Sequence, residues 1–395
     1  MLTPAYLTGV SSDVVSIFSE VEQEVAADMA GRIVRMGQVS FTTQWQADRL
    51  KQFGLFNDDV TKLMSEATGI SKRKINKLMA QAGVESLKYD DAIYSAAGLS
   101  PTALANSPAL QAVLLQGASS TMGLLSNFTK TTANASNLAF QRLLDKAYIQ
   151  IMSGAYAPNK AIRLAINELA SQGIEHIAYP SGSMDSIESS VRRAVTTGVN
   201  QSISKLQIAR AKEMECELVE TSSHSGARPT HEVWQGQIFS LSRDSGRYPD
   251  FYDSTGYGDG DGLCGWNCYH SFFPYFDGLS TRSFSEDPAG DYGRSNTEEY
   301  ELQQKQRYYE RQVRDAKKKC TVLDAAAESS TSQEEYAEYK KDFQNASVLL
   351  KGREQALDNF LDKTGRRRDK DREQVGGFTR SISSKAVWAN RKARK

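Results

Sequence analysis

Residues 11–37 read SSDVVSIFSEVEQEVAADMAGRIVRMG, and their apolar positions decide the fold class. The apolar side chains recur every three or four residues, at Val14, Phe18, Val21, Val25, Met29 and Ile33. This spacing places them on one face of an α-helix, with Ser11 or Ser12 as the N-cap and Gly37 at the end. The segment therefore predicts a long amphipathic helix in a mainly α protein.

Helical patterns continue to about residue 215. Short helices are expected over 43–53, 58–67 and 72–82, with Gly54, Gly69 and Gly83 as stops, and others over 134–153, 158–172 and 185–214. Ser107-Pro108 is expected to open one more, and Pro158 stands at a favoured first position. The small residues of 185–214, Ala194, Thr197, Gly198 and Ser202, would let another element approach closely.

The pattern changes after residue 215. The stretches CELVETSS (216–223) and QIFSLS (237–242) have the alternation of short strands. Two charged helices follow, over about 298–319 and 332–363. We predict a mainly α fold with a smaller α+β module, in four regions. These are a helical region 1–215, a compact α+β module 216–290, a charged helical hairpin 291–365 and a basic, flexible tail 366–395.

The composition is that of a globular protein, because hydrophobic residues make up 39% and charged residues 24% of the 395. Four cysteines are too few for a secreted disulfide framework of this length. The opening MLTPAYLTGVSSD lacks the basic and apolar parts of a signal peptide, and no stretch reaches the ~18 apolar residues of a membrane span. We therefore expect folding in a reducing cytoplasm and no membrane span.

The formal net charge is zero but unevenly spread. Residues 366–395 hold eleven Lys and Arg against three Asp and Glu, a net charge of +8, so the remainder carries −8. Cations mixed with Phe378 and Trp388 suit non-specific contact with a nucleic-acid backbone. The candidate contacts are Arg366, Arg367, Arg368, Lys370, Arg372, Arg391, Lys392, Arg394 and Lys395. The alternative is a solvated tail that binds nothing.

The densest chemical signal lies in GARPTHEVWQG (226–236) and GYGDGDGLCGWNCYHSFFP (256–274). Cys264, Cys268 and His270 are three potential metal ligands within seven residues. His231, or alternatively His224, would complete a tetrahedral zinc site, although this spacing is not a common finger spacing. The competing interpretation makes both cysteines small core residues and His270 a turn cap.

Three further interpretations remain open. On a strand, Cys268 and His270 would share one face as a thiolate–imidazole pair, but nothing obvious orients the imidazole. The glycine-rich run 256–262 lacks the Lys-Ser/Thr of a phosphate-binding loop, and its acidic residues favour a flexible turn over a calcium site. The stretch ATGISKRKINKLMAQAGV (67–84) admits a helix-turn-helix, or simply a helical pair with a basic face.

The two segments 226–236 and 256–274 resemble the phage minor capsid protein 2 family, related to the phage Mu protein F-like head morphogenesis proteins. LTPAYL, TTANAS, YPSG, VRRAVTTGVNQ and ELQQKQRYYERQ extend the resemblance over nearly the whole chain. The family's signature positions would be Arg228, Pro229, His231, Trp234, Gly236, Cys264, Gly265, Asn267, Cys268, His270 and Pro274. Relatives often carry a basic residue where this chain has Tyr269, which weakens any role of this loop in DNA contact.

The resemblance implies a low-copy structural protein of a tailed-phage head, made in the bacterial cytoplasm and located in the virion. Its expected partners are the portal protein or the major capsid protein, and packaged double-stranded DNA. We predict no enzymatic activity and no cofactor other than a structural zinc ion. The alternative is an enzyme or toxin-like effector that uses the Cys/His region, with Glu232 or Asp253 as the orienting acid.

Overall fold

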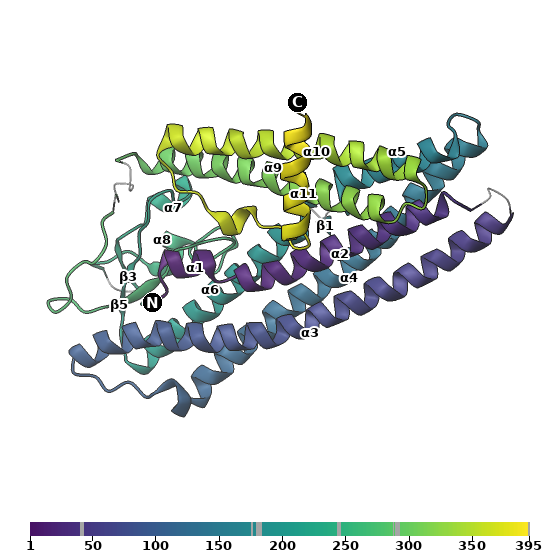
Figure 1. Ribbon diagram of the computed structural model, residues 1–395. Helices are drawn as coiled ribbons and strands as arrows, with labels where there is room; N and C mark the ends of the chain where they lie inside the picture. Colours follow the sequence, from purple (N-terminus) through teal and green to yellow (C-terminus); the bar gives the residue numbers. More distant parts are fainter. Residues whose placement is uncertain are drawn as a thin grey trace. The chain divides into compact units, whose positions relative to one another are not determined.

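The computed structural model describes residues 1–39, 43–174, 177–178, 184–242, 246–286, 288 and 293–393. The helices are α1 (Pro4–Gly9), α2 (Ser12–Met36), α3 (Thr43–Ala96), η1 (Leu104–Asn106), α4 (Pro108–Met152), α5 (Pro158–Gln172), α6 (Ile187–Glu213), α7 (Pro229–Glu232), α8 (Phe251–Thr255), α9 (Asn296–Glu328), α10 (Gln333–Thr364), η2 (Lys370–Glu373) and α11 (Arg380–Ala393) (Figure 1). The strands are β1 (Ile177–Ala178), β2 (Met184–Asp185), β3 (Leu218–Thr221), β4 (Ile238–Ser240) and β5 (Phe272–Tyr275). The predicted fold class, mainly α with a small α+β module, is confirmed.

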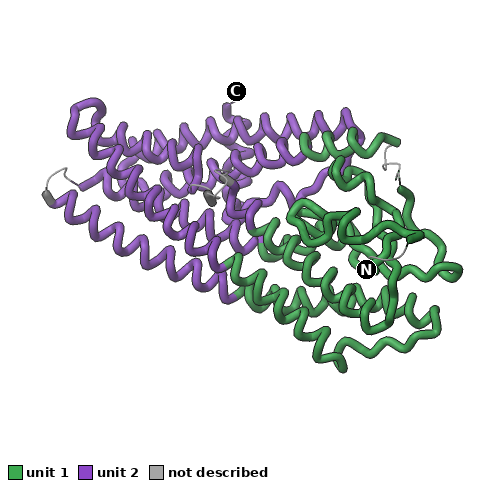
Figure 2. Tube along the Cα trace, turned by 180° about the vertical axis from the view of Figure 1, so that it is seen from behind, with its two compact units in different colours: residues 1–14, 70–125, 191–305 green, residues 15–69, 126–190, 306–395 purple. Residues whose placement is uncertain are grey.

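The chain forms two compact units, each built from separate stretches of sequence (Figure 2). Unit 1 comprises residues 1–14, 70–125 and 191–305, and unit 2 comprises residues 15–69, 126–190 and 306–395. Helices α2, α3, α4, α6 and α9 contribute residues to both. The units therefore cut across the four consecutive regions expected from the sequence.

Helix α2 forms where its apolar periodicity predicts it, over Ser12–Met36. In unit 2, Phe18, Val25, Met29 and Ile33 are fully buried, so the predicted stripe is the core-facing side. Among the described residues, no helix is both long and apolar enough to cross a bilayer.

The short helices expected between residues 43 and 82 are instead one helix, α3, of 54 residues. Gly54, Gly69 and Gly83 do not end it, because a glycine inside a helix costs only about 1 kcal/mol relative to alanine. Burial of side chains such as Phe56 and Met64 outweighs that cost. The helix-turn-helix interpretation of residues 67–84 is wrong for the same reason, since these residues lie within α3.

Small residues bring α4 and α6 close together within unit 1, as the sequence predicted. A Cβ on Gly198 of α6 would lie 2.2 Å from Oγ1 of Thr121 of α4. A Cβ on Gly117 of α4 would lie 2.0 Å from Oγ of Ser202 of α6. Since real side chains do not approach this closely, the contact requires glycine at both positions.

The α+β part of unit 1 contains a three-stranded antiparallel sheet in the order β4-β3-β5. Val219 of the central strand pairs with Phe239 of β4 and Pro274 of β5. The sequence predicted β3 and β4 but missed β5, because all four of its residues are buried and show no alternation. Pro274 is tolerated because β5 is an edge strand of this sheet.

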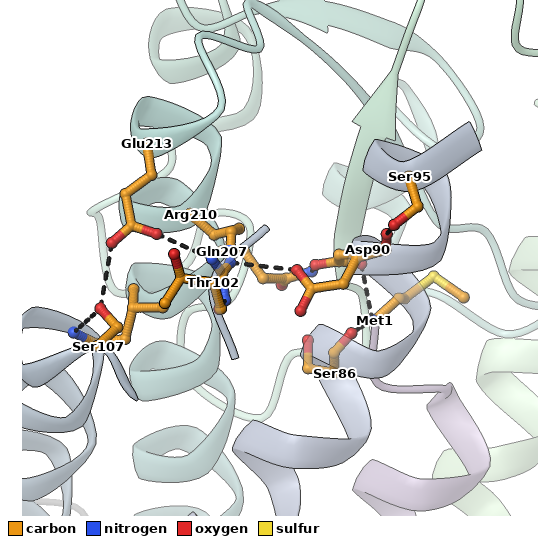
Figure 3. A network of polar contacts seen from close by, with 11 residues as sticks. Met1, Ser86, Asp90, Ser95, Thr102, Ser107, Gln207, Arg210 and Glu213 are labelled. Atoms are coloured by element: carbon orange, nitrogen blue, oxygen red, sulfur yellow. Dashed lines mark hydrogen bonds and ion pairs between the residues drawn. The ribbon is translucent and has the colours of Figure 1, made fainter. Parts of the chain in front are cut away.

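A buried polar network ties the sheet to the helices of unit 1 (Figure 3). Gln207 of α6 donates from Nε2 to Oδ2 of Asp90 of α3 at 2.8 Å and to the carbonyl of Phe272 at 2.6 Å. Arg210, fully buried one turn later, pairs with Asp91 at 3.2 Å and with Glu213 at 3.0 Å. Burial raises the pKa of Asp90, although the amino group of Met1 lies 3.0 Å away. The amide of Gln207 thus joins β5 to the buried carboxylate of α3.

The C-terminal segment, residues 366–393, differs from the flexible tail expected from its charge. It contains η2 and α11, and α11 buries Ile382, Ala386 and Ala389 within unit 2. The backbone N–H of Gly376 donates to Oγ of Ser19 of α2 at 2.9 Å. A Cβ on Gly376 would lie 2.3 Å from the backbone nitrogen of Glu20, so the chain passes α2 in direct backbone contact. The sequence signal for this packing was the helical spacing of Ile382, Ala386 and Ala389, which stand among basic residues.

Candidate functional site

Three residues of unit 1 form what we call the Cys/His cluster: His231, Cys268 and His270. His231 lies on α7, which Pro229 begins at a favoured first position. Cys268 and His270 lie on the extended chain that enters β5. All three are at most 2% exposed.

The side chains of the Cys/His cluster converge on a single point. Sγ of Cys268 lies 3.5 Å from Nδ1 of His270 and 3.8 Å from Nδ1 of His231. The three potential ligand atoms all lie within 4.8 Å of one another. Trp234 packs against both imidazole rings, with centroid distances of 4.9 Å to His231 and 4.7 Å to His270.

The outer nitrogen of each imidazole is held by a hydrogen bond. Nε2 of His231 lies 2.7 Å from the carbonyl oxygen of Asp261, which can only accept, so Nε2 carries the proton. Nε2 of His270 lies 2.8 Å from Oε1 of Gln235. That amide is oriented by the backbone N–H of His224, which donates to the same Oε1 at 2.9 Å. In both neutral rings Nδ1 is therefore the acceptor that faces Cys268.

Burial sets the charge state of the cluster. It raises the pKa of the Cys268 thiol to about 11, and it lowers the pKa of His231 and, further, that of His270. At neutral pH the site therefore holds a thiol and two neutral imidazoles, not the thiolate–imidazolium pair that nucleophilic catalysis uses. Cys268 and His270 are both about 1% exposed, so neither reacting atom is open to a substrate in this structure.

Cys264, predicted as a ligand together with Cys268 and His270, is not part of the cluster. Its backbone is left-handed, with φ of 60°, within a turn closed by the Gly265 N–H on the Gly262 carbonyl. Sγ of Cys264 approaches the carbonyl oxygen of His270 at 3.7 Å and packs in the apolar core around Val219 and Phe239. The interpretation of this cysteine as a core residue fits better than its interpretation as a ligand.

The remaining signature positions shape the loops around the cluster. A Cβ on Gly236 would lie 2.4 Å from the carbonyl oxygen of Ser285, and one on Gly265 would lie 2.4 Å from that of Gly260. Asn267 is also left-handed, and its backbone N–H donates to Oγ1 of Thr197 at 3.1 Å. Arg228 donates from Nη2 to the carbonyl oxygen of Trp266.

Two positioning residues were not predicted from the sequence. Gln235 lies between the signature residues Trp234 and Gly236, and a polar amide at this position was the available signal. Asn200 of α6 donates from Nδ2 to the carbonyl oxygens of Cys268 and His270, each at 3.0 Å. Its place in VRRAVTTGVNQ, one turn after Thr197, becomes informative only once α6 is known to face this loop.

The acidic residues of the glycine-rich run do not form a cation site. Within the described part of the chain, the Cys/His cluster is the one close group of three or more potential ligands, and Asp253, Asp259 and Asp261 form none. The backbone carbonyl of Asp261 instead accepts a hydrogen bond from Nε2 of His231. Glu232, one candidate orienting acid, accepts a hydrogen bond from Asn296 at 3.0 Å.

The predicted nucleic-acid contacts have two kinds of surroundings in unit 2. Arg366, Arg368 and Arg372 bond to Gln306, to Glu373 and Asp358, and to Asp369, respectively. Arg367, Lys370, Arg391 and Lys392 are exposed. Arg394 and Lys395, like the quoted segment YPSG, lie outside the described residues.

Comparison with known proteins places these features in a family. The profile of the phage minor capsid protein 2 family matches residues 2–362. A structural protein of Lactococcus phage LL-H is 28% identical over 195 residues, 47% of this chain and 50% of that protein. A structural protein of Lactococcus phage mv4 is 42% identical over 71 residues, 17% of this chain and 51% of that protein.

The chain thus spans about half the length of the curated relatives it matches. No solved structure matches it. The family match covers more than nine-tenths of the sequence and includes every signature position of the Cys/His region. The chain belongs to the phage minor capsid protein 2 family.

Proposed function

We propose that the protein is a component of the virion head that docks on the portal or the inner capsid and contacts packaged double-stranded DNA without sequence preference. Family membership makes it a phage structural protein. The head location and the DNA contact are the finer steps of the proposal. The observation that carries the DNA contact is the surface of α11.

Helix α11 has two unlike faces. Ile382, Ala386 and Ala389 face the core of unit 2, whereas Arg380, Trp388, Arg391 and Lys392 are exposed. Lys392 Nζ lies 5.5 Å from the centre of the Trp388 ring, and Trp388 is 66% exposed. An ordered helix that presents cations and an aromatic ring suits phosphate contact supported by stacking.

A separate surface in unit 2 supports docking on a protein. Leu138, Ile149 and Met152 of α4 are 63%, 64% and 57% exposed, and Leu138 and Ile149 line one shallow groove along that helix. The other residues that line this groove are polar or charged, and exposed apolar side chains with a polar rim are found at protein interaction surfaces. We assign the exposed apolar residues of α4 to the contact with the portal or inner capsid, and α11 to the contact with DNA.

The location is tested by quantitative mass spectrometry on purified heads and on the free cytosol of infected cells. We expect the protein in heads at a few copies per particle. Its absence from particles, with the protein free in the cytosol, would overturn the proposal.

The DNA contact is tested by measuring affinity against salt for the full-length protein and the Arg380→Gln/Arg391→Gln/Lys392→Gln variant. If the three side chains meet phosphates, the slope of log affinity against log salt falls by roughly 0.9 for each. Exposed apolar residues on α4 provide the control, because Leu138→Gln should leave the slope unchanged. Equal slopes for wild type and the triple variant would remove α11 as the DNA contact.

A further inference from the structure

We propose that His231, Cys268 and His270 bind a zinc ion, through Nδ1, Sγ and Nδ1, as a structural centre that fastens α7 to the chain entering β5. The site is independent of the DNA contact proposed for α11, because all three ligands lie in unit 1 and α11 lies in unit 2. It does not involve any of the basic residues discussed above.

The two sulfur–nitrogen spacings of the cluster are those of a tetrahedral metal site. Zn–S and Zn–N bonds of about 2.3 and 2.0–2.1 Å at a tetrahedral angle put sulfur and nitrogen about 3.6 Å apart. The two observed Sγ–Nδ1 distances are 3.5 and 3.8 Å. All three atoms lie within 4.8 Å of one another, and a zinc ion would hold the two nitrogens about 3.3 Å apart. Any closing movement on zinc binding therefore falls on the two imidazoles.

Hydrogen bonding alone does not satisfy the three atoms. Both neutral histidines carry their single ring proton on the outer nitrogen, Nε2. Both inner nitrogens, Nδ1, are therefore acceptors. The thiol of Cys268 has one proton and can donate to only one of them. The second Nδ1 would then face sulfur lone pairs in a buried site and have no hydrogen-bond donor, which is unfavourable. A bound cation accepts electron pairs from both nitrogens and from sulfur.

The groups behind the ligands are those that a metal site needs. Metal-binding histidines regularly donate their other ring N–H to a carbonyl or amide oxygen, which fixes the ring and the tautomer. Asp261 and Gln235 supply these acceptors. Asn200 clamps the two backbone carbonyls that flank Tyr269, so the loop carrying two of the ligands is held by α6.

The ligand types suit a transition-metal ion. Two imidazoles with one thiolate suit zinc and also copper, whereas calcium and magnesium take oxygen ligands. The thiolate forms when the metal displaces the proton of the Cys268 thiol, which is released to solvent. We propose zinc, and elemental analysis distinguishes it from copper. The cluster supplies three protein ligands, since Cys264 does not join it. The four buried cysteines are all free thiols, so no disulfide competes for Cys268.

The test uses the full-length protein purified with a tag that contains no histidine. Elemental analysis should find about one zinc per chain. After chelation, cobalt(II) should give the absorption of a tetrahedral site together with a thiolate-to-cobalt charge-transfer band. Cys268→Ala should lose both signals, and Cys264→Ala, an equally buried cysteine four residues away, should keep both.

Wild-type measurements keep the proposal testable even if Cys268→Ala does not fold. Zinc added to the chelated wild-type protein should raise its thermal midpoint, as any ligand that binds the folded state does. A folded wild-type protein without zinc, without a cobalt charge-transfer band and without that rise would overturn the proposal. Loss of metal from Cys264→Ala to the same extent as from Cys268→Ala would also overturn the assigned ligand set.

Discussion

The Cys/His cluster and the C-terminal segment both gather polar side chains, but they satisfy them in opposite ways. In the cluster, Asp261 and Gln235 take the outer protons of the two imidazoles, and the remaining acceptors point inward at one sulfur. In the C-terminal segment, cations either pair with carboxylates, as Arg368 does with Glu373, or point outward, as Arg391 does. One arrangement converges on a point, and the other spreads over a surface.

This difference indicates what each region can bind. Converging acceptors with too few protons suit a small cation, because one ion satisfies all of them. Outward cations without a fixed geometry suit a polyanion, which is recognised by charge and not by shape. Substitutions in the two regions should therefore have different effects on stability and on binding.

The largest effect is expected where charges are largely buried next to the C-terminal segment. Lys318 lies 2.8 Å from Glu22 and 3.6 Å from Glu188, and Ser19, which receives the Gly376 N–H, donates to Glu188. Lys318→Met leaves two buried carboxylates with too little positive charge, so the free energy of unfolding should fall by about 3–5 kcal/mol. Urea denaturation measures this loss.

Its control is the adjacent position. Lys319 donates to Ser171 in an exposed contact, so Lys319→Met should change stability by no more than about 0.5 kcal/mol. Similar losses in both variants would mean that the buried charges do not organise this region.

The second prediction concerns Gln235, which orients the imidazole of His270 in the Cys/His cluster. Gln235→Leu removes the acceptor for His270 Nε2 and for the His224 N–H, so stability should fall by about 1–3 kcal/mol. If the cluster binds zinc, the affinity should also fall by about 10–100-fold, because the ring is no longer oriented. Competition with a chromogenic chelator measures the affinity. Gln235→Glu keeps the acceptor oxygen and should retain most of it, and a Glu variant as weak as Leu would contradict this role.

The sequence predicted well the helix whose apolar spacing is unbroken, α2, but it wrongly divided α3 at its glycines. The apolar stripe of α2 correctly predicted the buried face and the ends of the helix, because an apolar residue recurs at every turn. Gly54 and Gly69 misled in α3, since a local stop signal worth about 1 kcal/mol is overruled by distant packing. The charge of residues 366–395 similarly hid the apolar spacing that packs α11.

The candidate site was predicted in its residues but not in its arrangement. Residue type and spacing singled out His231, Cys268 and His270, which the fold brings together. They could not exclude Cys264, because its direction depends on a left-handed backbone in a glycine turn. Nor could they find Asn200, which lies 68 residues before Cys268 and approaches it only through the packing of α6.

The third prediction uses a partly exposed ion pair of unit 2. Burial alone would raise the pKa of Asp342, but hydrogen bonds from Arg163 and Asn167 outweigh it and lower the pKa. A lowered folded pKa stabilises the protein above the unfolded value and loses this contribution as pH falls through the folded value. Asp342→Asn should therefore cost about 1 kcal/mol at pH 7.

The pH dependence distinguishes the ion pair from simple packing. The difference in unfolding free energy between wild type and Asp342→Asn should stay constant from pH 7 to about pH 5 and shrink below about pH 4. Urea midpoints across this range measure it. A difference that persists unchanged at about pH 2 would mean that shape, and not charge, holds α5 to α10.

The smallest effect on stability is expected for the outward cations, where binding is the informative measurement. Arg391→Gln should change stability by less than about 0.5 kcal/mol, because the side chain is exposed at the end of α11. If the C-terminal segment meets phosphates, the same variant should lower the salt slope of DNA binding by roughly 0.9.

The matched control for Arg391→Gln is Arg247→Gln, which removes an equal charge from an exposed arginine of unit 1 that pairs with Asp277. It should leave the slope unchanged, because its position lies outside the basic segment. If both variants reduced the slope equally, the protein would respond to DNA only through its net charge. The distinction between a converging site and a binding surface would then hold for the cluster alone. A slope that falls only for Arg391→Gln would instead place phosphates against α11, since salt dependence counts the cations that a polyanion actually neutralises.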